Sequence, residues 1–395
     1  MDRFVSWFSL SLFLLLFSVS GVPADQESQA FDLRAIEKPR ILTKAKSYLS
    51  EKPRTVTADR CERSEGDAHD FYSEGDYWWP NPQDPDGPYI RRDGETNPAN
   101  FIAHRQSMIR LSELIGTLVS AYLITKEENY ASKAVSHLRA WFVEPGTRMR
   151  PSLLYGQAIK GRHTGRSIGI IDTLHLVEVA RGAKILCSSP SFMLADQKAV
   201  KAWFGDYLQW INSHEYGLKE KFHPNNHGVC WSLQASAFAD LVGNEKVLSW
   251  VRGQFKTVYL SGMMDGQGRF PAELKRTKPY GYSLFVIDAM AGVAQIASSK
   301  KEDLWNYTTT DGKSMAKGMA FIYPFIIDKE SWPLKPDIMY WEEWPVRHPS
   351  LLFSGVRFGK PAYLDAWESL EADPQTYEVL RNLPIRHPLL WASPA

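Results

Sequence analysis

The chain has 395 residues, and its 46 basic and 45 acidic residues leave a net charge of +1. Hydrophobic residues make up 44% and charged residues 23%, a globular composition that excludes a disordered or collagen-like chain. Proteins that neutralise nucleic-acid phosphates carry a basic excess, so we expect no nucleic-acid partner. Aromatic residues reach 13% and indicate either a core of large side chains or a surface that stacks on sugar rings.

The N-terminal segment has the pattern of a secretory signal peptide. Arg3 precedes an apolar run over residues 5–19, and small residues after the run offer a cleavage site. The alternative is a membrane anchor, but the run is too short to span a bilayer, and no later stretch looks able to do so. We therefore expect residues 1–24 to be removed. Residues 25–395 should form a single domain of a secreted or periplasmic protein that does not contact the membrane.

From about residue 100 onward, the sequence predicts helices joined by loops. Between residues 101 and 126, for example, Met108, Leu111 and Ile115 share one helical face. The same spacing predicts helices over residues 129–143, 167–186, 194–211, 227–242, 245–260, 282–298, 312–327 and 362–371. Convincing strands are few, so successive helices should form antiparallel hairpins stacked in a ring or solenoid.

Two segments, residues 61–100 and 331–350, break the helical pattern. Both are rich in Gly or Pro and in aromatic residues, too many for solvated linkers. Long ordered loops in a helical domain often carry function. Their aromatic side chains could plug one end of the helical ring or form a platform for sugars, and one residue can do both.

The most informative stretch is residues 223–231, which contains Asn225-Asn226-His227 where a loop enters a predicted helix. Either Asn could simply cap that helix, because Asn is a preferred N-cap residue. His223 and His227 lie four residues apart, as metal ligands on a helix do, but a Pro and the Asn pair argue against a regular helix there. No Glu stands between the two His as in the zinc protease signature, so we expect no metal.

Two further stretches combine basic and polar residues at loop positions. Residues 273–283 contain three cations and two tyrosines before an apolar helix, and residues 157–166 contain two glycines typical of a tight loop. Taken singly, the first is equally consistent with a solvated basic loop that has tyrosines packed beneath it. In the second, Arg166 could form a structural ion pair with Asp172. Neither stretch is decisive alone.

Together, these stretches resemble the alginate lyase superfamily over roughly residues 60–350. The motifs that carry the resemblance are Asn225-Asn226-His227 with Trp231, Glu273-Leu274 with Arg276-Thr277, Tyr282-Ser283, Gly161-Arg162 with Gly165-Arg166, Ile171-Asp172, and the loop from Ser73 to Pro80. The resemblance implies an all-α dominant fold, an incomplete (α/α) toroid of helical hairpins. It also implies a polysaccharide lyase whose substrate is an anionic, uronic-acid-containing polymer. The loop from Ser73 to Pro80 resembles the branch acting on mannuronan or glucuronan, so the expected substrates are alginate, as poly-mannuronate, or glucuronan.

β-Elimination of a uronic-acid polymer makes demands that these residue types can meet. The proton on C5 is very weakly acidic while the neighbouring carboxylate is charged, so an enzyme without a metal must neutralise that charge with preorganised donors. An Asn amide and an Arg guanidinium suit this task, and Arg binds a carboxylate through two donors. A base must also reach C5, and an acid must reach the leaving oxygen.

The resemblance distributes these tasks among named residues. Asn226 and Arg276 neutralise the carboxylate, and Tyr282 is the acid at the leaving oxygen and a candidate for the base. His227 is the base for one C5 epimer or an orienting partner. Tyr282 is favoured over Tyr280 because it begins the helix as the family pattern does. Neighbouring cations should lower the pKa of Tyr282 from about 10 by favouring the phenolate. No cofactor or metal is expected.

Other polar and aromatic side chains are candidates for substrate contacts. They are Tyr77, Trp78, Trp79, His69, His104, Arg105, Gln157, Arg162, Arg166, Tyr280, Lys275 and Trp341. Two other classes of protein stay open. An inverting glycoside hydrolase would need two carboxylates flanking the bond, which Glu74 or Asp76 could supply together with Glu342 or Glu343. A non-catalytic sugar-binding protein would keep the aromatic loops without needing Tyr282.

Overall fold

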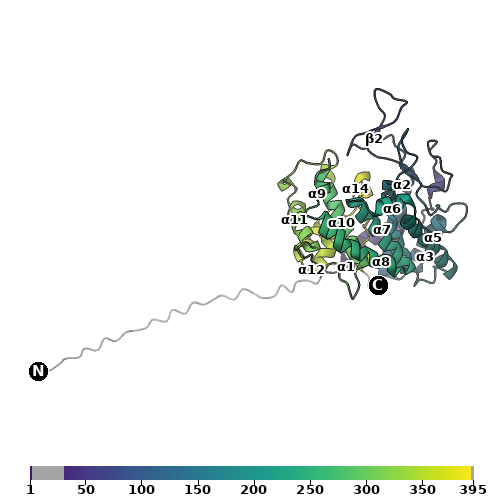
Figure 1. The fold of residues 1–395 in the computed structure, drawn as a ribbon. Helices are drawn as coiled ribbons and strands as arrows, with labels where there is room; N and C mark the ends of the chain where they lie inside the picture. Colours follow the sequence, from purple (N-terminus) through teal and green to yellow (C-terminus); the bar gives the residue numbers. More distant parts are fainter. Residues whose placement is uncertain (2–30, 393–395) are drawn as a thin grey trace. The chain divides into compact units, whose positions relative to one another are not determined.

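The protein is described by a computed structural model that covers Met1 and residues 31–392 and is dominated by helices (Figure 1). The predicted signal segment, residues 1–24, lies outside the described residues apart from Met1. From Leu33 onward, the described chain forms one compact unit.

The elements follow one another as helices with a few very short strands. The longer helices are α1 (Leu33–Tyr48), α2 (Ala103–Thr125), α3 (Glu128–Phe142), α4 (Leu176–Leu186), α5 (Leu194–Ser213), α7 (Asn226–Val242), α8 (Glu245–Gln254), α10 (Pro279–Ala297), α11 (Met315–Ile327), α12 (Pro349–Phe358) and α13 (Pro361–Ser369). The shorter helical pieces are η1 (Val56–Ala58), η2 (Ser167–Thr173), α6 (Glu215–Lys221), η3 (Phe255–Met263), α9 (Pro271–Leu274), η4 (Lys329–Ser331), η5 (Trp341–Glu343), α14 (Tyr377–Arg381) and α15 (Leu389–Ala392). The strands are β1 (Tyr72–Glu74), β2 (Trp78–Trp79), β3 (Ile90–Arg91) and β4 (Tyr155–Ala158).

The helices form two concentric layers. In the inner layer, α2, α4, α7, α10 and α12 pack on one another in chain order. In the outer layer, α1 and α3 pack on α2, α5 and α8 on α7, α11 on α10 and α13 on α12. The inner helices α7 and α10 are buried on nearly every face, because they have neighbours on all sides. The predicted all-α fold, an incomplete (α/α) toroid of helical hairpins, is confirmed.

The observed helices differ from the sequence pattern in three places. The stretch predicted as one helix over 167–186 begins as the 3-10 turn η2, because the Gly169 backbone lies directly against that of Gly156 in β4 and leaves no room for a side chain. The stretch 245–260 continues beyond α8 as the π-helical η3. The periodicity does not predict α1, which contains Pro39 and is only weakly amphipathic.

Two later helices pass a length and composition test for membrane spans, contrary to the expectation from the sequence. These are α2 and α10, whose apolar windows are 78% and 89% buried inside the fold. The apolar side chains of α2 and α10 therefore belong to the core of the toroid, where inner helices need no polar face.

The C-terminal segment after α14 fills the space between the inner helices. The buried carboxylate of Glu178 on α4 lies 2.7 Å from His387 Nδ1 and also accepts from the indole of Trp391. His387 reaches a Thr hydroxyl of α2, and Trp391 packs on an aromatic ring of α12. Ile385 packs against Gly292 of α10, in space that the glycine leaves free because it has no side chain. A Leu of α7 lies beside the same glycine. This segment thus ties all five inner helices together.

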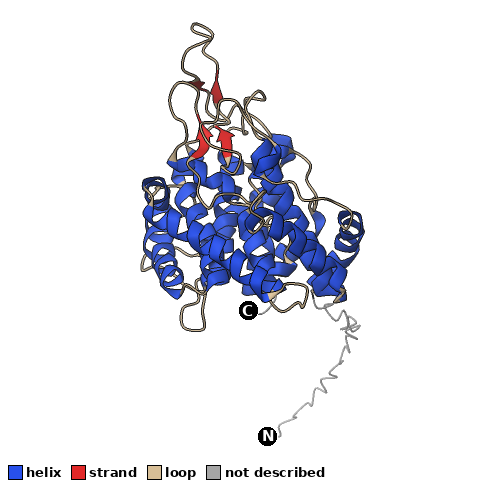
Figure 2. Cartoon of the chain, turned by 90° about the vertical axis from the view of Figure 1, so that its right-hand side faces the viewer, coloured by secondary structure: helices blue, strands red, loops and turns tan. Residues whose placement is uncertain are grey.

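The four strands gather at one end of the helical layers (Figure 2). β1 pairs with β4 in parallel, and β2 with β3 in antiparallel fashion. β2 carries Trp78, and the loops around the strands carry Tyr77 and Arg166, so this end of the toroid brings residues from distant segments to the N-termini of α7 and α10.

Candidate active site

A cavity of about 360 Å³ opens at the end of the toroid where α7 and α10 begin. All four residues predicted to carry the chemistry line it, and so do four of the predicted substrate-binding residues. These eight are Asn226, His227, Arg276, Tyr282, Tyr77, Trp78, Gln157 and Arg166. The sequence segments that contribute them are up to 205 positions apart, as for Tyr77 and Tyr282.

The first group of side chains, which we call the histidine cluster, consists of Glu220, Asn226, His227 and Glu273. Helix α7 starts here because the Asn225 side chain caps it, accepting from the His227 amide at 3.1 Å. His227 Nδ1 lies 2.6 Å from Glu220 Oε1 of α6. In the neutral imidazole that has its hydrogen on Nδ1, this hydrogen is donated to the carboxylate, and Nε2 carries the lone pair that a base requires.

Within the same cluster, Asn226 is held by Glu273 of α9. The carboxylate accepts from the Asn226 amide nitrogen of the backbone at 2.8 Å and from its side-chain Nδ2 at 2.6 Å. Burial raises the pKa of Glu273, and the two donors from Asn226 oppose that rise. The side-chain amide is thereby fixed in one orientation at the cavity wall, with one Nδ2 hydrogen left over.

The second group, which we call the tyrosine cluster, consists of Tyr77, Arg276 and Tyr282. Tyr282 lies in the first turn of α10, whose N-terminus is capped by the Asp337 carboxylate. Its hydroxyl is 2.7 Å from the hydroxyl of Tyr77 in the β1–β2 loop. The Arg276 guanidinium stacks 4.4 Å from the Tyr282 ring centroid and donates to its hydroxyl at 3.3 Å.

The predicted lowering of the Tyr282 pKa is wrong for this structure. Burial raises the pKa of Tyr282 well above its ordinary value, and the neighbouring Tyr77 adds to that rise. Lys278 and Arg276 lower the pKa of Tyr282, but by less than burial and Tyr77 raise it. Tyr282 is therefore a neutral phenol at neutral pH, which suits an acid that waits for a leaving oxygen.

Arg276 is not free in this structure. Its Nε and Nη2 lie 3.3 and 3.1 Å from the carboxylate of Asp93, which follows β3. Charge-assisted hydrogen bonds between such groups are ordinarily about 2.7–2.9 Å long, so this pair is loosely made. A substrate carboxylate could compete for the same guanidinium.

Arg166 is the cavity's least compensated charge. It donates from Nε and Nη2 to the backbone and side-chain oxygens of Gln157, at 2.9 Å each, and no carboxylate of the described residues lies within ion-pair distance. Burial lowers its pKa to about 10. Gly75 allows this placement, because a side chain there would begin 2.8 Å from Arg166 Nη2. The suggested ion pair of Arg166 with Asp172 is not formed.

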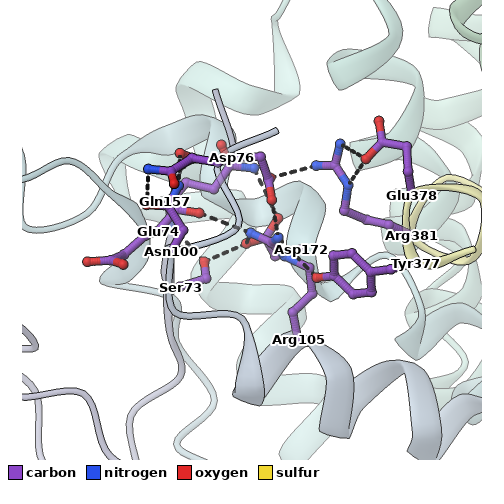
Figure 3. A network of polar contacts seen from close by, with 12 residues as sticks. Ser73, Glu74, Asp76, Asn100, Arg105, Gln157, Asp172, Tyr377, Glu378 and Arg381 are labelled. Carbon is purple, nitrogen blue, oxygen red and sulfur yellow. Dashed lines mark hydrogen bonds and ion pairs between the residues drawn. The ribbon is translucent and has the colours of Figure 1, made fainter. Parts of the chain in front are cut away.

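Asp172 belongs instead to a buried ion network (Figure 3), two members of which, Asp76 and Arg381, line the cavity. Arg105, which is fully buried, donates to Asp172 at 2.8 Å and to Asp76 at 2.7 Å. Asp76 also pairs with Arg381 of α14 at 2.8 Å, and Arg381 donates to Glu378. This network fixes the loop that carries Tyr77 against the C-terminal part of the chain.

Four predicted binding residues have structural partners instead of places in the cavity. Arg105 is the centre of the buried network, and the buried His104 bonds to backbone at Tyr72 and Asp59. Tyr280 is fully buried, and its hydroxyl donates to a backbone carbonyl at 3.0 Å. Trp341 packs on the Tyr280 ring at 5.2 Å. The ring of Trp341 therefore packs on the fold, as the plug interpretation expects, and its role in a sugar platform stays a prediction.

Four further candidates also lie outside the cavity. His69 lines a separate surface hollow and bonds to a backbone carbonyl at 2.7 Å. The Trp79 indole donates to the Glu95 carbonyl, so its polar edge is already used. Arg162 and Lys275 are exposed, and the Arg162 guanidinium lies over the Trp78 ring at 5.4 Å from its centroid.

Several residues of the site were not predicted. Glu220 orients His227, and Glu273 orients Asn226. The sequence analysis gave neither carboxylate a role, although Glu273 stands in the Glu273-Leu274 motif. Arg91, Arg381 and Asn382 also line the cavity. The last two lie beyond the stretch that resembles the family.

Comparison with known proteins places the chain in a family. The alginate lyase family model matches residues 55–332, and the chain belongs to this family. A crystal structure of an alginate lyase from Bacteroides ovatus is 30% identical, with 91% of this chain and 93% of that chain covered and a TM-score of 0.78. The class is thus a polysaccharide lyase.

More distant solved structures share the fold. Alginate lyase A1-III from Sphingomonas species A1 is 14% identical, with 90% of this chain and 95% of that chain covered and a TM-score of 0.55. A variant of alginate lyase A1-III complexed with a tetrasaccharide is 13% identical, with coverage of 90% and 94% and a TM-score of 0.58. A comparison with the curated proteins finds no match.

Proposed function

We propose that this lyase cleaves a uronic-acid polysaccharide by β-elimination, with poly-mannuronate in alginate or glucuronan as substrate, and that it works as a secreted or periplasmic enzyme. The observation that carries the proposal is that a neutral tyrosine and a carboxylate-bound histidine, Tyr282 and His227, line one cavity. An acid and a base are the two groups that elimination needs.

The charge of the cavity favours an anionic substrate. Four arginines line it, and Asp76 is the single carboxylate among its lining residues. Burial alone would raise the pKa of Asp76, but Arg105 and Arg381 outweigh it and keep the group ionised. Among the described residues, the half-buried Arg166 has no carboxylate partner, and an uncompensated cation partly removed from water is costly unless a ligand supplies the counter-charge. A uronate carboxylate is such a ligand.

The reaction follows from these positions. Donors from Asn226, Arg276 and Arg166 withdraw charge from the substrate carboxylate, which makes the C5 proton more acidic. The base takes that proton, the electron pair forms the C4–C5 double bond, and the bond from C4 to the bridging oxygen breaks. Tyr282 gives its proton to the departing oxygen, and one new chain end carries an unsaturated uronate.

The identity of the base depends on the configuration at C5. His227, with Nε2 unprotonated, removes the proton from one epimer. For the other epimer, Tyr282 serves as base and then as acid on the same face of the sugar. The raised pKa of Tyr282 makes the phenolate rare, so this second route should be the slower one unless substrate binding changes the local charge.

The geometry does not favour a glycoside hydrolase. Such an enzyme needs two carboxylates on either side of the scissile bond. Asp76 is bound by two arginines, and Glu74 is bound by Arg63 at 2.7 Å. Glu343 accepts from a Thr hydroxyl outside the cavity.

The deciding experiment is ultraviolet absorbance of the unsaturated product. Purified protein should raise the absorbance with mannuronan or glucuronan, and less with guluronan or glycosaminoglycans. Full activity after exhaustive chelation is expected, because amide and guanidinium donors take the place of a cation. New reducing ends without absorbance would identify a hydrolase, and loss of activity restored by one divalent ion would revive the pair His223 and His227 as ligands.

A further inference from the structure

We propose that Lys278 and Glu378 act as a positioning pair that governs how readily Tyr282 gives up its proton, which makes helix α14 a functional part of the active site. The inference rests on the proposed role of Tyr282 as the acid. Neither residue lines the cavity, so neither can contact the substrate. Glu378 also lies outside the residues matched by the family model.

Lys278 lies beneath the tyrosine cluster. It directly precedes α10, and its side chain is 5% exposed. Its ammonium lies 5.0 Å from the ring centroid of Tyr77, 5.6 Å from that of Tyr282 and 5.3 Å from that of Tyr340. A cation at this distance from a buried phenol favours the phenolate, because little water screens it.

Glu378 holds that ammonium in place. Its Oε1 forms an ion pair with Lys278, and its Oε2 accepts from Arg381 at 2.9 Å. The hydroxyl of Tyr77 lies 3.5 Å from the same Oε1 that binds Lys278. Removing two such charges from water is expensive, so a merely structural contact at this point would be served as well by apolar side chains.

The surrounding donors determine which of the two tyrosine hydroxyls donates its hydrogen to the other. Arg381 Nη2 donates to the Tyr77 hydroxyl at 3.2 Å, so the hydrogen of Tyr77 must point to another acceptor. Tyr282 at 2.7 Å is the better acceptor, and Glu378 at 3.5 Å is the worse. The hydrogen of Tyr282 is then left for the substrate. Once it is transferred, the phenolate oxygen accepts from Tyr77 and from Arg276.

The charges that face this hydroxyl pair come from three segments. Asp76 lies on the β1–β2 loop, Arg276 and Lys278 precede α10, and α14 supplies Glu378 and Arg381. Burial raises the pKa of Tyr282 most, Lys278 and Arg276 lower it, and Glu378 raises it. Removing one member of the Lys278–Glu378 pair should therefore move that pKa in the direction opposite to removing the other.

The test is the pH dependence of kcat/KM for Glu378→Gln and Lys278→Met in the full-length enzyme, with mannuronan or glucuronan as substrate. The wild type should show no alkaline fall up to about pH 10, the ordinary pKa of Tyr. Glu378→Gln leaves Lys278 uncompensated, so its alkaline fall should move down by about one pH unit or more into the measured range. Lys278→Met should show no such fall and should lose roughly tenfold in kcat, because the phenolate is less stabilised.

Rescue variants separate this role from a structural one. Lys278→Arg keeps the cation and should retain several-fold more kcat than Lys278→Met. If Glu378→Gln does not fold, the comparison of kcat between Lys278→Arg and Lys278→Met still tests the proposal. Glu113→Gln is the matched control, since it removes a buried carboxylate paired with Arg386 outside the cavity. It should lower Tm and leave the pH profile unchanged.

The possible failures are distinguishable. If the wild type forms no unsaturated product from any uronate polymer, the proposed function fails. If the wild type eliminates but Glu378→Gln keeps the wild-type profile, or if both substitutions move it in the same direction, only the role of the Lys278–Glu378 pair fails. Equal kcat for Lys278→Arg and Lys278→Met would also overturn it.

Discussion

The histidine cluster and the tyrosine cluster both place a carboxylate behind the reacting group, but they do so in different ways. Glu220 touches the imidazole of His227 directly, at 2.6 Å. Glu378 reaches Tyr282 only through Lys278 and Tyr77. A carboxylate bound directly to Nδ1 fixes the orientation of the imidazole and leaves Nε2 as the nitrogen that can meet the substrate. A carboxylate that acts through a cation keeps the phenol protonated until the leaving oxygen accepts the proton.

The two clusters also differ in how the chain assembles them. The histidine cluster comes from α6, the start of α7 and α9, which lie within one stretch of the chain, residues 215–274. The tyrosine cluster joins a loop near β2 to the start of α10 and rests on α14 near the C-terminus. The groups that hold the base and the acid therefore come from different elements, although the clusters meet where the Arg276 backbone N–H donates to the Glu273 carbonyl at 3.0 Å.

The largest expected effect is on the tyrosine side. Tyr282→Phe keeps the ring and removes the hydroxyl, so packing should survive. If Tyr282 is the general acid, kcat should fall by roughly 10²–10⁴, the contribution of such a group. KM should change little, because the hydroxyl acts mainly in the transition state. Steady-state kinetics by ultraviolet absorbance measure both, and a variant with more than a tenth of wild-type kcat would remove Tyr282 from the reaction.

A smaller loss is expected on the histidine side. Glu220→Gln keeps the shape of the side chain but removes the charge that orients His227. We expect kcat to fall roughly 10- to 100-fold on the epimer that uses His227 as base, a part of a general base's contribution. Glu215→Gln on the same helix is the control, because Glu215 pairs only with the exposed Lys219. Equal losses on both epimers would argue that His227 orients the substrate and is not a base.

Local sequence patterns predicted the reacting groups but not their supports. Asn226, His227, Arg276 and Tyr282 lie in short motifs, and their side chains face the cavity because each sits in or next to the first turn of a helix. Glu220 and Glu378 were not predicted. Glu378 pairs with Lys278 across 100 residues, which leaves no pattern in one sequence, and Glu220 lies seven residues before His227 in a helix without a motif. The toroid itself was predictable, because amphipathic helices in unbroken succession admit few other packings.

The two aromatic loops show a second limit of sequence reasoning. Both are rich in Trp and Tyr, and composition alone treats them alike. The loop after β1 places Trp78 at the cavity, whereas the loop before α12 packs Trp332 and Trp341 around Tyr280. The two loops differ in their tertiary contacts. The first loop is anchored by the buried Arg105 network, and the second covers the start of α10.

The third prediction tests that difference between the loops. Trp78→Ala should raise KM for the polymer by roughly 5- to 30-fold, the worth of one aromatic contact, with a lesser effect on kcat. Trp341→Ala should leave KM near the wild-type value and lower Tm, because its ring packs on Tyr280 and Lys329. A KM increase in Trp341→Ala equal to that in Trp78→Ala would mean that the second loop also binds substrate.

The smallest effect on catalysis is expected from Tyr280→Phe, the matched counterpart of Tyr282→Phe two residues away. Tyr280 is fully buried, and its hydroxyl donates to the Phe325 carbonyl at 3.0 Å, away from the cavity. Without that bond, a buried carbonyl has lost its hydrogen-bond donor, which costs about 1–2 kcal/mol of unfolding free energy. Denaturant unfolding should show this loss while kcat and KM stay within about twofold of the wild type, because α10 keeps its Asp337 cap. If kcat collapses instead, with Tyr282→Phe near wild type, the proton comes from Tyr280, and the cavity must open toward the second aromatic loop during turnover.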